Sequence, residues 1–476
     1  MDNTAIRTLS VCRILNTQQI LFNAGGCDRM KRSILMNPKE KRPPTLVAGD
    51  AESLFTRPWR KRLIRLFKSV VPAHTPPDRQ IWLDTIRKIN DFTNKLDDPD
   101  FDLSHVDYIV IAESISDIYD IIKFFSCLRD RLPDHARIIY TSYNFFWSPI
   151  FKLGGLIGLS RKRTGSRFYL EADLDTFMQM SGWENVRSIR HYLLPCDVPI
   201  LSSVFEQFLV RLPIVRRFSL NTVKFARKSH GTSIRDYSVT VLVPCRNEEG
   251  NIEAVVKRMP AFSNALEILF INDSSTDKTE SRILEMQQKF PEKNIVLTQG
   301  KGLGKGEAVR AGMIHATGEI CIILDADLTV IPEDLPQFYD AMKLRYADFL
   351  HGTRIIYPQE RGSMRFLNTI GNMGFAIIFS YIVEQRTTDT LCGTKVYWRR
   401  DWPLFEEVRE RLGRTDIWGD YNIIFGATHF GLKVAQLPVR YFERLEGKTK
   451  MVRRLRNAGV MMKVACYALW RIKFFK

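Results

Sequence analysis

Short apolar runs alternate with amphipathic segments along most of this chain. In the C-terminal half the runs are brief and rich in β-branched residues, as in SVTVLV and EILFIN, which predicts strands. The segments between them repeat apolar positions at helical spacing, which predicts helices. The predicted order is strand 238–243, helix 249–258, strand 267–272, helix 275–289, strand 294–298, helix 307–316 and strand 320–324. This alternation favours right-handed βαβ units on a mostly parallel sheet.

The N-terminal half has a second, less regular α/β alternation. The predicted elements are a basic amphipathic helix at 55–71, strand 108–112, helix 116–132, strand 136–142, and a helix and strand within 174–194. A polar, charged stretch at 224–236 (KFARKSHGTSIRD) is expected to separate the two halves. The expected organisation is a flexible leader at 1–46, an α/β domain at 47–230, a second α/β domain at 237–450 and a basic amphipathic helix at 451–476.

Composition restricts the class of protein. The 476 residues are 45% hydrophobic and 26% charged, which are globular values and exclude wholesale disorder and a polytopic membrane protein. The net charge of +17 favours an anionic partner such as a nucleotide, nucleic acid or acidic membrane surface. The eight cysteines include no C-x-x-C pair, and the N-terminus has no secretory apolar core. We therefore expect free thiols and a cytoplasmic location.

Polar residues follow several predicted strands, where parallel sheets bind ligands. Asp325 and Asp327 come directly after an apolar strand, and alternation puts both carboxylates on one side. Such oxygen ligands suit Mg²⁺ or Mn²⁺, whose shell is commonly completed by water and substrate phosphates. The alternative is that Asp325 caps a turn while Asp327 is solvated. The loop KGLGKG, with Lys301 and Lys305, is either a phosphate-approaching loop or a solvated surface turn.

Eight motifs in one order carry a resemblance to a known family. They are VTVLVPCRNEEGNI, FINDSSTDKT, GKGLGKGEAVRAGM, ILDADLTVIPEDL, GTRI, DTLCGTK, WGDYNIIFGA and RYFERLEGKTKM. This series resembles the family 2 glycosyltransferases, and within them the polyprenyl-phosphate sugar synthases such as dolichyl-phosphate mannose synthase. The resemblance implies a glycosyltransferase A fold, Rossmann-like with a mostly parallel sheet. It also implies inverting, metal-dependent transfer of a hexose from a UDP- or GDP-sugar to a polyprenyl phosphate or other cell-envelope acceptor.

The same resemblance implies roles for individual residues. The residues implied in nucleotide-sugar binding are Pro244, Arg246, Glu248, Asp273, Asp325 and Arg354. Lys305 is added to this group as the lysine of the Gly/Lys loop described above. Asp325 and Asp327 match the metal carboxylates, and Arg444 and Lys450 resemble the residues that meet an acceptor phosphate. The sequence departs from the family pattern at two positions, with Arg246 in place of a tyrosine and Asn272 in place of the first of two aspartates.

Two further aspartates are candidates for the acceptor side of the site. Asp420 in WGDYNIIFGA matches the carboxylate that deprotonates a hydroxyl acceptor in many family members, and Asp389 in DTLCGTK is a second candidate. A phosphate acceptor needs no such base, because its second pKa near 6 leaves it mostly dianionic at pH 7. Asp420 then has a positioning or binding role. A capping or purely structural role is the alternative for either residue.

Two segments suggest contact with a membrane surface. Residues 366–383 (FLNTIGNMGFAIIFSYIV) lack charge but contain polar residues, which favours an interfacial helix over a span. Residues 440–476 hold 11 Lys and Arg against 2 Asp and Glu, with apolar residues at helical spacing. Such a helix either lies on anionic lipid or packs on the sheet with its cations solvated. We expect a protein peripheral on the cytoplasmic membrane face.

The N-terminal half, with HVDYIVIAESISDIY and the later YLEADLDTFMQMSGWENVRSIRHYLLP, resembles the second half of a class I methyltransferase. Between Val47 and Ile109 the only glycine is Gly49, so the glycine-rich loop that approaches S-adenosylmethionine is missing. We expect an incomplete methyltransferase-like domain that binds no S-adenosylmethionine and serves in scaffolding, dimerisation or docking.

Two other functions remain as alternatives. The departures at Arg246 and Asn272 allow an inactive glycosyltransferase-like scaffold. A nucleic-acid-binding protein would explain the basic tail, but the chain has none of the expected recognition motifs, so we expect no nucleic-acid partner. The pattern leaves the oligomeric state open.

Overall fold

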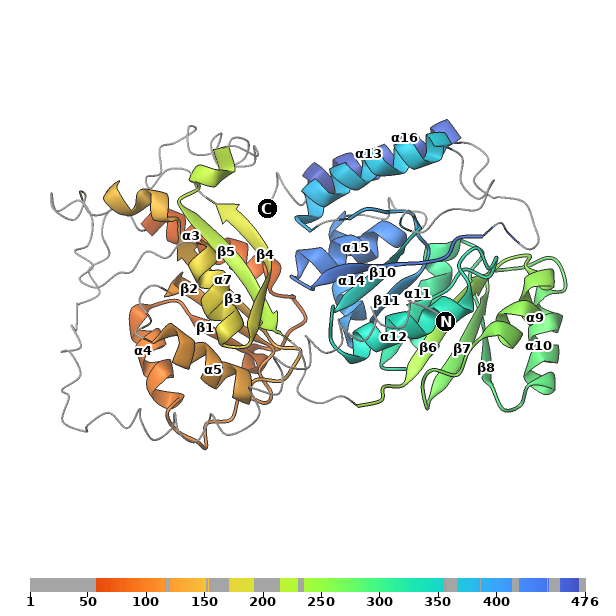
Figure 1. Ribbon diagram of the computed structural model, residues 1–476, viewed down its shortest axis with the longest axis horizontal. Coiled ribbons are helices and arrows are strands. Elements are labelled where there is room, and N and C mark those ends of the chain that lie inside the picture. The colour runs from red at the N-terminus through yellow and green to blue at the C-terminus, as the bar shows by residue number, and fades with distance from the viewer. Residues whose placement is uncertain are drawn as a thin grey trace, which may run out of the picture. The chain divides into compact units, whose positions relative to one another are not determined.

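The computed structural model (Figure 1) describes residues 57–115, 118, 120–150, 153, 171–191, 215–229, 235–354, 356, 366–385, 387–412, 419–442, 444 and 454–470. All of these belong to one compact unit that spans residues 53–476. The predicted leader at 1–46 and the predicted phosphate-binding Lys450 lie outside the described residues.

The N-terminal part contains a five-stranded sheet with the order β1-β2-β3-β5-β4. β1, β2 and β3 are parallel, whereas β5 is antiparallel to both of its neighbours. The last strand in the sequence therefore lies between two earlier ones. The strands are β1 (Gln80–Leu83), β2 (Tyr108–Ser114), β3 (Arg137–Tyr143), β4 (Trp183–His191) and β5 (Asn221–Lys228), and the helices are α3 (Arg57–Val70), η1 (Pro77–Arg79), α4 (Ile86–Lys95), α5 (Ile121–Arg131), η3 (Phe145–Trp147), α7 (Glu171–Met180) and η5 (Val215–Phe218).

The prediction that residues 224–236 form a polar separator is wrong for its first part. Lys224 and Arg227 lie within β5, and both side chains are buried. The Nζ atom of Lys224 contacts Asp175 at 2.8 Å, and Nε of Arg227 contacts Glu184 at 2.6 Å. By composition this strand resembles a polar linker. Its own sequence shows only the cations, because the acidic residues that pair with them belong to other elements.

The C-terminal part is built on a seven-stranded sheet with the order β12-β10-β11-β9-β6-β7-β8. All pairings are parallel except the two made by β11, which runs antiparallel to β9 and β10. This confirms the expected mixed α/β architecture with a mostly parallel sheet. The strands are β6 (Val239–Cys245), β7 (Leu266–Asn272), β8 (Asn294–Gln299), β9 (Ile320–Ile323), β10 (Phe349–Thr353), β11 (Lys395–Trp398) and β12 (Val434–Pro438).

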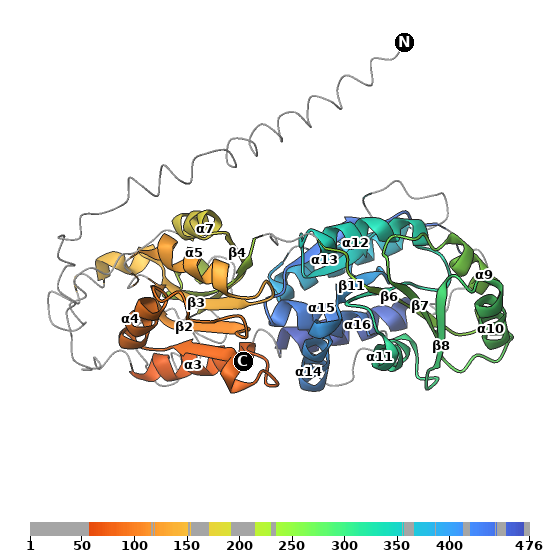
Figure 2. The same cartoon turned by 90° about the horizontal axis from the view of Figure 1, so that it is seen from below.

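Helices cover both faces of this sheet, which explains why its central strands are almost wholly apolar. One core cluster joins the sheet to α9, α10 and α12, and the other joins it to α11, α13, α14, α15 and α16. Figure 2 gives a second view of these layers. The helices are α9 (Glu249–Arg258), α10 (Thr279–Lys289), α11 (Lys305–His315), η6 (Pro332–Asp334), α12 (Leu335–Lys343), α13 (Phe366–Val383), η7 (Arg399–Asp401), α14 (Trp402–Leu412), α15 (Asp420–His429) and α16 (Arg454–Ala468).

Most predicted elements are present, and the larger differences in their bounds lie at helix starts. α5 begins at Ile121 instead of residue 116, because the carboxylate of Asp120 accepts a hydrogen bond from the amide of Lys123 and caps the helix. α10 begins at Thr279, four residues later than expected, and α11 begins earlier, at Lys305. Across the described residues, none of the helices combines the length and apolarity that a membrane span requires.

Buried charges connect the two sheets. Asp348 precedes β10, and its carboxylate contacts Arg137 of β3 at 2.8 Å and Arg227 of β5 at 3.0 Å. The same carboxylate accepts a hydrogen bond from the amide of Lys433. Burial alone would raise the pKa of Asp348, but the two guanidinium groups outweigh it and hold that pKa well below its usual range. The N-terminal sheet is therefore docked on the C-terminal sheet through paired, desolvated ions.

Candidate active site

Polar side chains gather where β6, β7 and β9 end at the same edge of the sheet. These three strands are neighbours and run parallel, so the segments that follow them meet in space. Asp273 follows β7, and Asp325 and Asp327 follow β9. α11 begins at this edge with Lys305, and α15 begins here with Asp420. The structure therefore brings together residues that are up to 150 positions apart, roughly the length of a small domain.

Lys305 lies between two of the predicted carboxylates. Its Nζ atom is 2.7 Å from Oδ1 of Asp325 and 3.8 Å from Oδ1 of Asp420. Burial by itself would lower the pKa of Lys305, but the two carboxylates outweigh it and raise that pKa. Burial would likewise raise the pKa of Asp325, yet attraction by Lys305 lowers it. Both groups are therefore charged at neutral pH. The ammonium group of Lys305 can bind an anionic diphosphate, and the carboxylate of Asp325 can bind a cation.

Asp327 is the less exposed of the two carboxylates after β9. Its Oδ1 atom accepts hydrogen bonds from the amide and hydroxyl of Thr329, at 3.2 and 2.8 Å. Its Oδ2 atom is 3.0 Å from Nη2 of Arg444. Burial, together with repulsion from Asp325, raises the pKa of Asp327. Without a bound cation, ionising both carboxylates is therefore unfavourable in free energy, and a bound cation would remove this penalty.

The donor atoms at this edge fit a divalent metal. Asp325 and Asp327 supply hard oxygen ligands at the mouth of the sheet, and Mg²⁺ or Mn²⁺ is usually held by one or two carboxylates with water and substrate phosphates. Within the described ranges, no group of three or more His, Cys, Asp or Glu residues has metal-binding geometry. A metal ion at Asp325 and Asp327 would therefore need its remaining ligands from water or from a phosphate-bearing substrate.

The backbone of Gly393 packs closely against the carboxylate of Asp325, a contact that the sequence did not reveal. A Cβ atom added at Gly393 would stand 1.9 Å from Oδ2 of Asp325 and 2.8 Å from Nζ of Lys305. Only a residue without a side chain lets the backbone approach the carboxylate this closely. The motif DTLCGTK contained the signal, but the contact depends on the antiparallel β11 strand that follows it.

Asp420 is held by a second lysine that the sequence analysis also missed. Nζ of Lys395 is 2.8 Å from Oδ1 of Asp420, and it donates a further hydrogen bond to the carbonyl of Cys392 at 2.7 Å. Lys395 is fully buried, and Asp420 is 9% exposed. Asp420 is the first residue of α15, where the helix dipole favours a negative charge. Its carboxylate is therefore fixed in place and still reaches the site edge.

Asp389, the other candidate for the acceptor side, orients a cation. Its oxygens accept hydrogen bonds from Nε and Nη2 of Arg354, at 2.7 and 2.9 Å, and its side chain is fully buried. The guanidinium of Arg354 also lies over the ring of Tyr441. Burial would lower the pKa of Arg354, but Asp389 outweighs it. This geometry favours Asp420 over Asp389 as the group that reaches an acceptor.

Asp273 organises the loop that carries the glycines and lysines. Its two carboxylate oxygens accept hydrogen bonds from the amides of Gly302 and Gly304, at 2.7 and 3.0 Å. Nη1 of Arg246 donates to the carbonyl of Gly302 at 3.2 Å, which ties the end of β6 to the same loop. Gly302 and Gly304 have positive φ angles of 70° and 101°, which disfavour other residues.

The other residues predicted at the nucleotide side lie along the same edge. Pro244 is the penultimate residue of β6, and Glu248 directly precedes α9. Oε2 of Glu248 accepts a hydrogen bond from Asn251 at 2.8 Å. Asn272, which replaces an aspartate of the family pattern, donates from Nδ2 to Glu280 at 2.9 Å. These hydrogen bonds therefore hold the polar side chains of Glu248 and Asn272 in fixed orientations.

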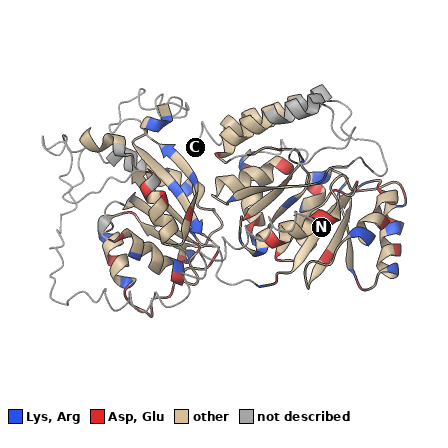
Figure 3. Cartoon of the chain, in the orientation of Figure 1, with Lys and Arg blue, Asp and Glu red and all other residues tan. Residues whose placement is uncertain are grey.

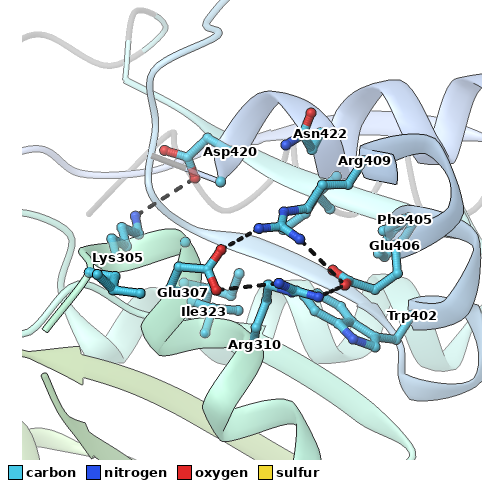
Figure 4. A pocket seen from close by; sticks show the side chains of 15 residues that line it. Lys305, Glu307, Arg310, Ile323, Trp402, Phe405, Glu406, Arg409, Asp420 and Asn422 are labelled. Atoms are coloured by element: carbon cyan, nitrogen blue, oxygen red, sulfur yellow. Dashed lines mark hydrogen bonds and ion pairs between the residues drawn. The ribbon is translucent and has the colours of Figure 1, made fainter. Parts of the chain in front are cut away.

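A cavity of about 180 Å³ adjoins Lys305 and Asp420. Neither Asp325 nor Asp327 lines it, so the cavity lies beside the carboxylate pair and does not contain it. Figure 4 shows a ring of alternating charges next to Trp402 in its wall. The members of this ring, each paired with two of the others, are Glu307, Arg310, Glu406 and Arg409.

The fold and the site together define a class of enzyme. A mostly parallel sheet ends in a carboxylate pair, a Gly/Lys loop and converging cations, an arrangement that suits a nucleotide-diphosphate substrate. Residues 240–402 match the model of the family "Glycosyl transferase family 2". The chain therefore contains a family 2 glycosyltransferase domain and is a glycosyltransferase.

Several curated proteins are similar to this chain. The "Dolichyl-phosphate beta-glucosyltransferase ALG5A" of Trichomonas vaginalis is 28% identical over 253 residues, which cover 49% of this chain and 76% of the relative. The "Dolichol-phosphate mannosyltransferase" of Pyrococcus furiosus is 34% identical over 120 residues, which cover 25% of this chain and 33% of the relative.

Two solved structures illustrate the structural comparison. Glucosyl-3-phosphoglycerate synthase from Mycobacterium tuberculosis, in complex with Mn²⁺, UDP and glucosyl-3-phosphoglycerate, is 17% identical, with a TM-score of 0.35 over 50% of this chain and 81% of that chain. The mannosyltransferase PcManGT from Pyrobaculum calidifontis, in complex with GDP-Man and Mn²⁺, is 22% identical, with a TM-score of 0.35 over 49% and 65%.

Proposed function

We propose that this protein is an inverting glycosyltransferase of the glycosyltransferase A type that moves a hexose from a UDP- or GDP-sugar to a polyprenyl phosphate. The observation that carries the proposal is the linked series of charges from Asp327 through Asp325 and Lys305 to Asp420. This series joins a metal-binding pair to an acceptor-side carboxylate inside a family 2 glycosyltransferase domain. The names of the two relatives, which specify dolichyl phosphate and dolichol phosphate, support the acceptor class.

The chemistry requires positive charge on the donor side. As the bond from the sugar to the diphosphate breaks, negative charge collects on the leaving diphosphate, and fixed cations in a shielded site stabilise it. Lys305 contacts Asp325 at 2.7 Å, and Arg444 contacts Asp327 at 3.0 Å. Mg²⁺ or Mn²⁺, when held by Asp325 and Asp327, would supply Lewis-acid stabilisation to the same leaving group.

The acceptor side needs orientation more than proton removal. A polyprenyl phosphate is mostly dianionic at pH 7, because its second pKa lies near 6. Arg354 is held in a fixed orientation by Asp389, and we assign it, with Arg444, to the phosphate groups of donor and acceptor. Asp420, fixed by Lys395, then orients the acceptor relative to the sugar and is not required as a base.

The first prediction tests the acceptor class. With a radiolabelled UDP- or GDP-hexose, Mn²⁺ and detergent-dispersed polyprenyl phosphate, we expect labelled lipid from one of the two donors. Asp420→Asn should lower kcat by about 100-fold, as loss of an orienting group does. The rate in both proteins should fall below about pH 6, where the acceptor phosphate gains a proton.

The pH profile separates the alternatives in this experiment. If the acidic limb disappears in Asp420→Asn, the limb reports protonation of Asp420 instead of the acceptor phosphate, and Asp420 acts as a base. If nucleotide binds but neither donor labels the lipid, the polyprenyl-phosphate acceptor is wrong. If well-folded protein binds neither UDP nor GDP, the scaffold alternative replaces the enzyme. Binding is measured by calorimetry in both proteins, because the buried Lys395 loses its charged partner in the variant.

We also propose that α13 and α16 form a membrane-binding surface, which would place the enzyme peripherally on the cytoplasmic membrane face. The sequence of α13 contains no charged residue, and its described part at 374–383 is tan in Figure 3. The two helices contact each other. On α16, Met461 and Val464 are buried in the core. Between them in the sequence, Met462 is 43% exposed and Lys463 is also exposed. An uncovered apolar face next to a cation suits an anionic lipid surface.

The second prediction tests this surface by vesicle flotation. Ile377 of α13 is 73% exposed, so Ile377→Asp should leave folding intact and weaken binding to vesicles of anionic phospholipid by about tenfold. Ile314 of α11 is 81% exposed and lies outside the proposed surface, so Ile314→Asp is the matched control. Equal losses in the two variants would contradict the proposal, as would a failure of the wild-type protein to float.

For the N-terminal part we propose an incomplete class I methyltransferase-like domain without S-adenosylmethionine binding. The described part of this half is an α/β unit in which β1, β2 and β3 are parallel, which is compatible with the proposal. Measurable binding of S-adenosylmethionine in calorimetry would contradict it. We retain 47–230, 237–450 and 451–476 as the proposed boundaries of the two domains and the basic tail.

A further inference from the structure

α15, the helix that begins with Asp420, is buried along its whole length. All ten of its residues are buried, from Asp420 to His429. Its N-terminal end is fixed by the contact between Asp420 and the fully buried Lys395. A helix of ten residues is about 15 Å long. Its C-terminal end therefore lies well away from the site, on the side toward the N-terminal sheet.

A buried arginine from the N-terminal sheet holds that far end. Nη1 of Arg187, in β4, donates hydrogen bonds to the carbonyls of Thr428 and His429, at 2.8 and 2.7 Å. These are the last two residues of α15, and the carbonyl of Thr428 also accepts a hydrogen bond from the amide of Gly431 at 3.2 Å. The side chain of Arg187 is 1% exposed. A cation at this position also complements the negative end of the helix dipole.

Arg187 makes two further contacts besides those with the helix carbonyls. Its Nε atom is 3.4 Å from Oε2 of Glu384, the residue after α13, and its guanidinium lies 5.5 Å from the ring centre of Phe225. Phe225 also packs against Gly431, just past α15, where an added Cβ atom would stand 2.6 Å from the ring. Burial lowers the pKa of Arg187, and Glu384 opposes that shift. The N-terminal sheet thus contacts the end of α15 through both hydrogen bonds and close packing.

We propose that Arg187 is a positioning residue for the transfer reaction, and that the N-terminal sheet serves the catalytic domain by fixing α15. Because α15 is a buried rigid element, a displacement of its C-terminal end also displaces Asp420 at its N-terminal end. A misplacement of about 1 Å in a reacting constellation costs about 100-fold in rate. This inference rests on the role proposed above for Asp420.

The matched control is a second arginine of the same kind. Arg227, in the neighbouring strand β5, is also buried, and its Nη2 donates to the carbonyls of Arg345 and Tyr346 at 2.7 and 3.1 Å. These carbonyls follow α12, which carries none of the proposed site residues. Both arginines donate to backbone carbonyls across the two sheets, although Arg227 also pairs with Asp348 and Glu184, and of the two only Arg187 holds the helix that begins with Asp420.

The experiment compares Arg187→Met, Arg187→Lys and Arg227→Met in the full-length protein. For Arg187→Met we expect kcat to fall at least tenfold while the donor KM and the nucleotide Kd stay within about twofold of wild type. Arg187→Lys keeps the charge and one hydrogen bond, so it should recover part of kcat. Arg227→Met also loses the ion pairs with Asp348 and Glu184, so it should lower the Tm at least as much and yet retain kcat. A loss of kcat that follows Tm equally in both methionine variants, or an unchanged kcat in Arg187→Met, would overturn the proposal.

Hydrogen exchange separates this inference from the proposed function. Amides of residues 420–429 should exchange faster in Arg187→Met than in Arg227→Met, whether or not lipid is labelled. If wild-type protein transfers no sugar but this difference appears, the proposed acceptor is wrong and the fixation of α15 stands. If transfer occurs but the difference is absent, Arg187 does not fix the helix. Should Arg187→Met not fold, Arg187→Lys answers the same question, because an exchange rate and a kcat equal to wild type would exclude the role.

Discussion

Gly393→Ala is expected to lower kcat/KM for sugar transfer by about 100-fold while the protein stays folded. The added methyl group would stand 1.9 Å from Oδ2 of Asp325, far inside the van der Waals contact distance. The carboxylate must therefore turn away. The methyl group would also stand 2.8 Å from Nζ of Lys305. Both clashing atoms are ends of flexible side chains, so the backbone is spared and the free energy of unfolding changes little. The fall in kcat/KM arises because metal and diphosphate binding require Asp325 and Lys305 in fixed positions.

The measurement combines transfer kinetics with calorimetric titration of UDP and GDP in Mn²⁺. Gly374→Ala is the matched control, because an added Cβ atom there meets nothing within 4 Å. We expect this control to bind nucleotide as wild type does. Wild-type nucleotide affinity and turnover in Gly393→Ala would mean that Asp325 is not used in the geometry described above. A large fall in Tm would mean that the clash is relieved by the backbone instead.

Asp327→Asn is expected to abolish the effect of Mn²⁺ on nucleotide binding, a loss of about 100-fold in affinity at saturating metal. The substitution removes one of the two carboxylates available for the metal. It should also raise the Tm of the metal-free protein, and the sign follows from the pKa. Burial and Asp325 raise the pKa of Asp327, so its ionised form is disfavoured in the folded protein at neutral pH. A neutral amide of the same shape removes that cost.

Both effects are measured on one preparation, by calorimetry with and without Mn²⁺ and by thermal unfolding in a chelator. Asp340→Asn, an exposed carboxylate on α12, is the control and should change neither quantity. If Mn²⁺ still strengthens nucleotide binding in Asp327→Asn, the metal is held elsewhere. If the Tm falls instead of rising, the pairing with Arg444 outweighs the repulsion from Asp325.

Local pattern predicted much of the C-terminal fold. Apolar runs and helical periodicity gave the strands and helices around the site, and the position of Asp325 and Asp327 at a strand end followed from that order. The helix starts were less accurate, since the cap that begins α5 at Ile121 involves a single hydrogen bond from Lys123. The strand β5 was missed, because Lys224 and Arg227 make its sequence look like a solvated linker.

The sequence by itself determined which residue types stand at the strand ends, and therefore the class of chemistry. Alternation and motif order act within a few residues, so they are readable without the fold. Only the tertiary structure decided which side chains meet. Lys395 holds Asp420, and Gly393 closes on Asp325 across an antiparallel strand. Arg187 reaches α15 from a different sheet. These pairings join positions that are distant in the chain, and a buried charge is stable only where its partner is brought to it, so the packing of the whole unit decides them.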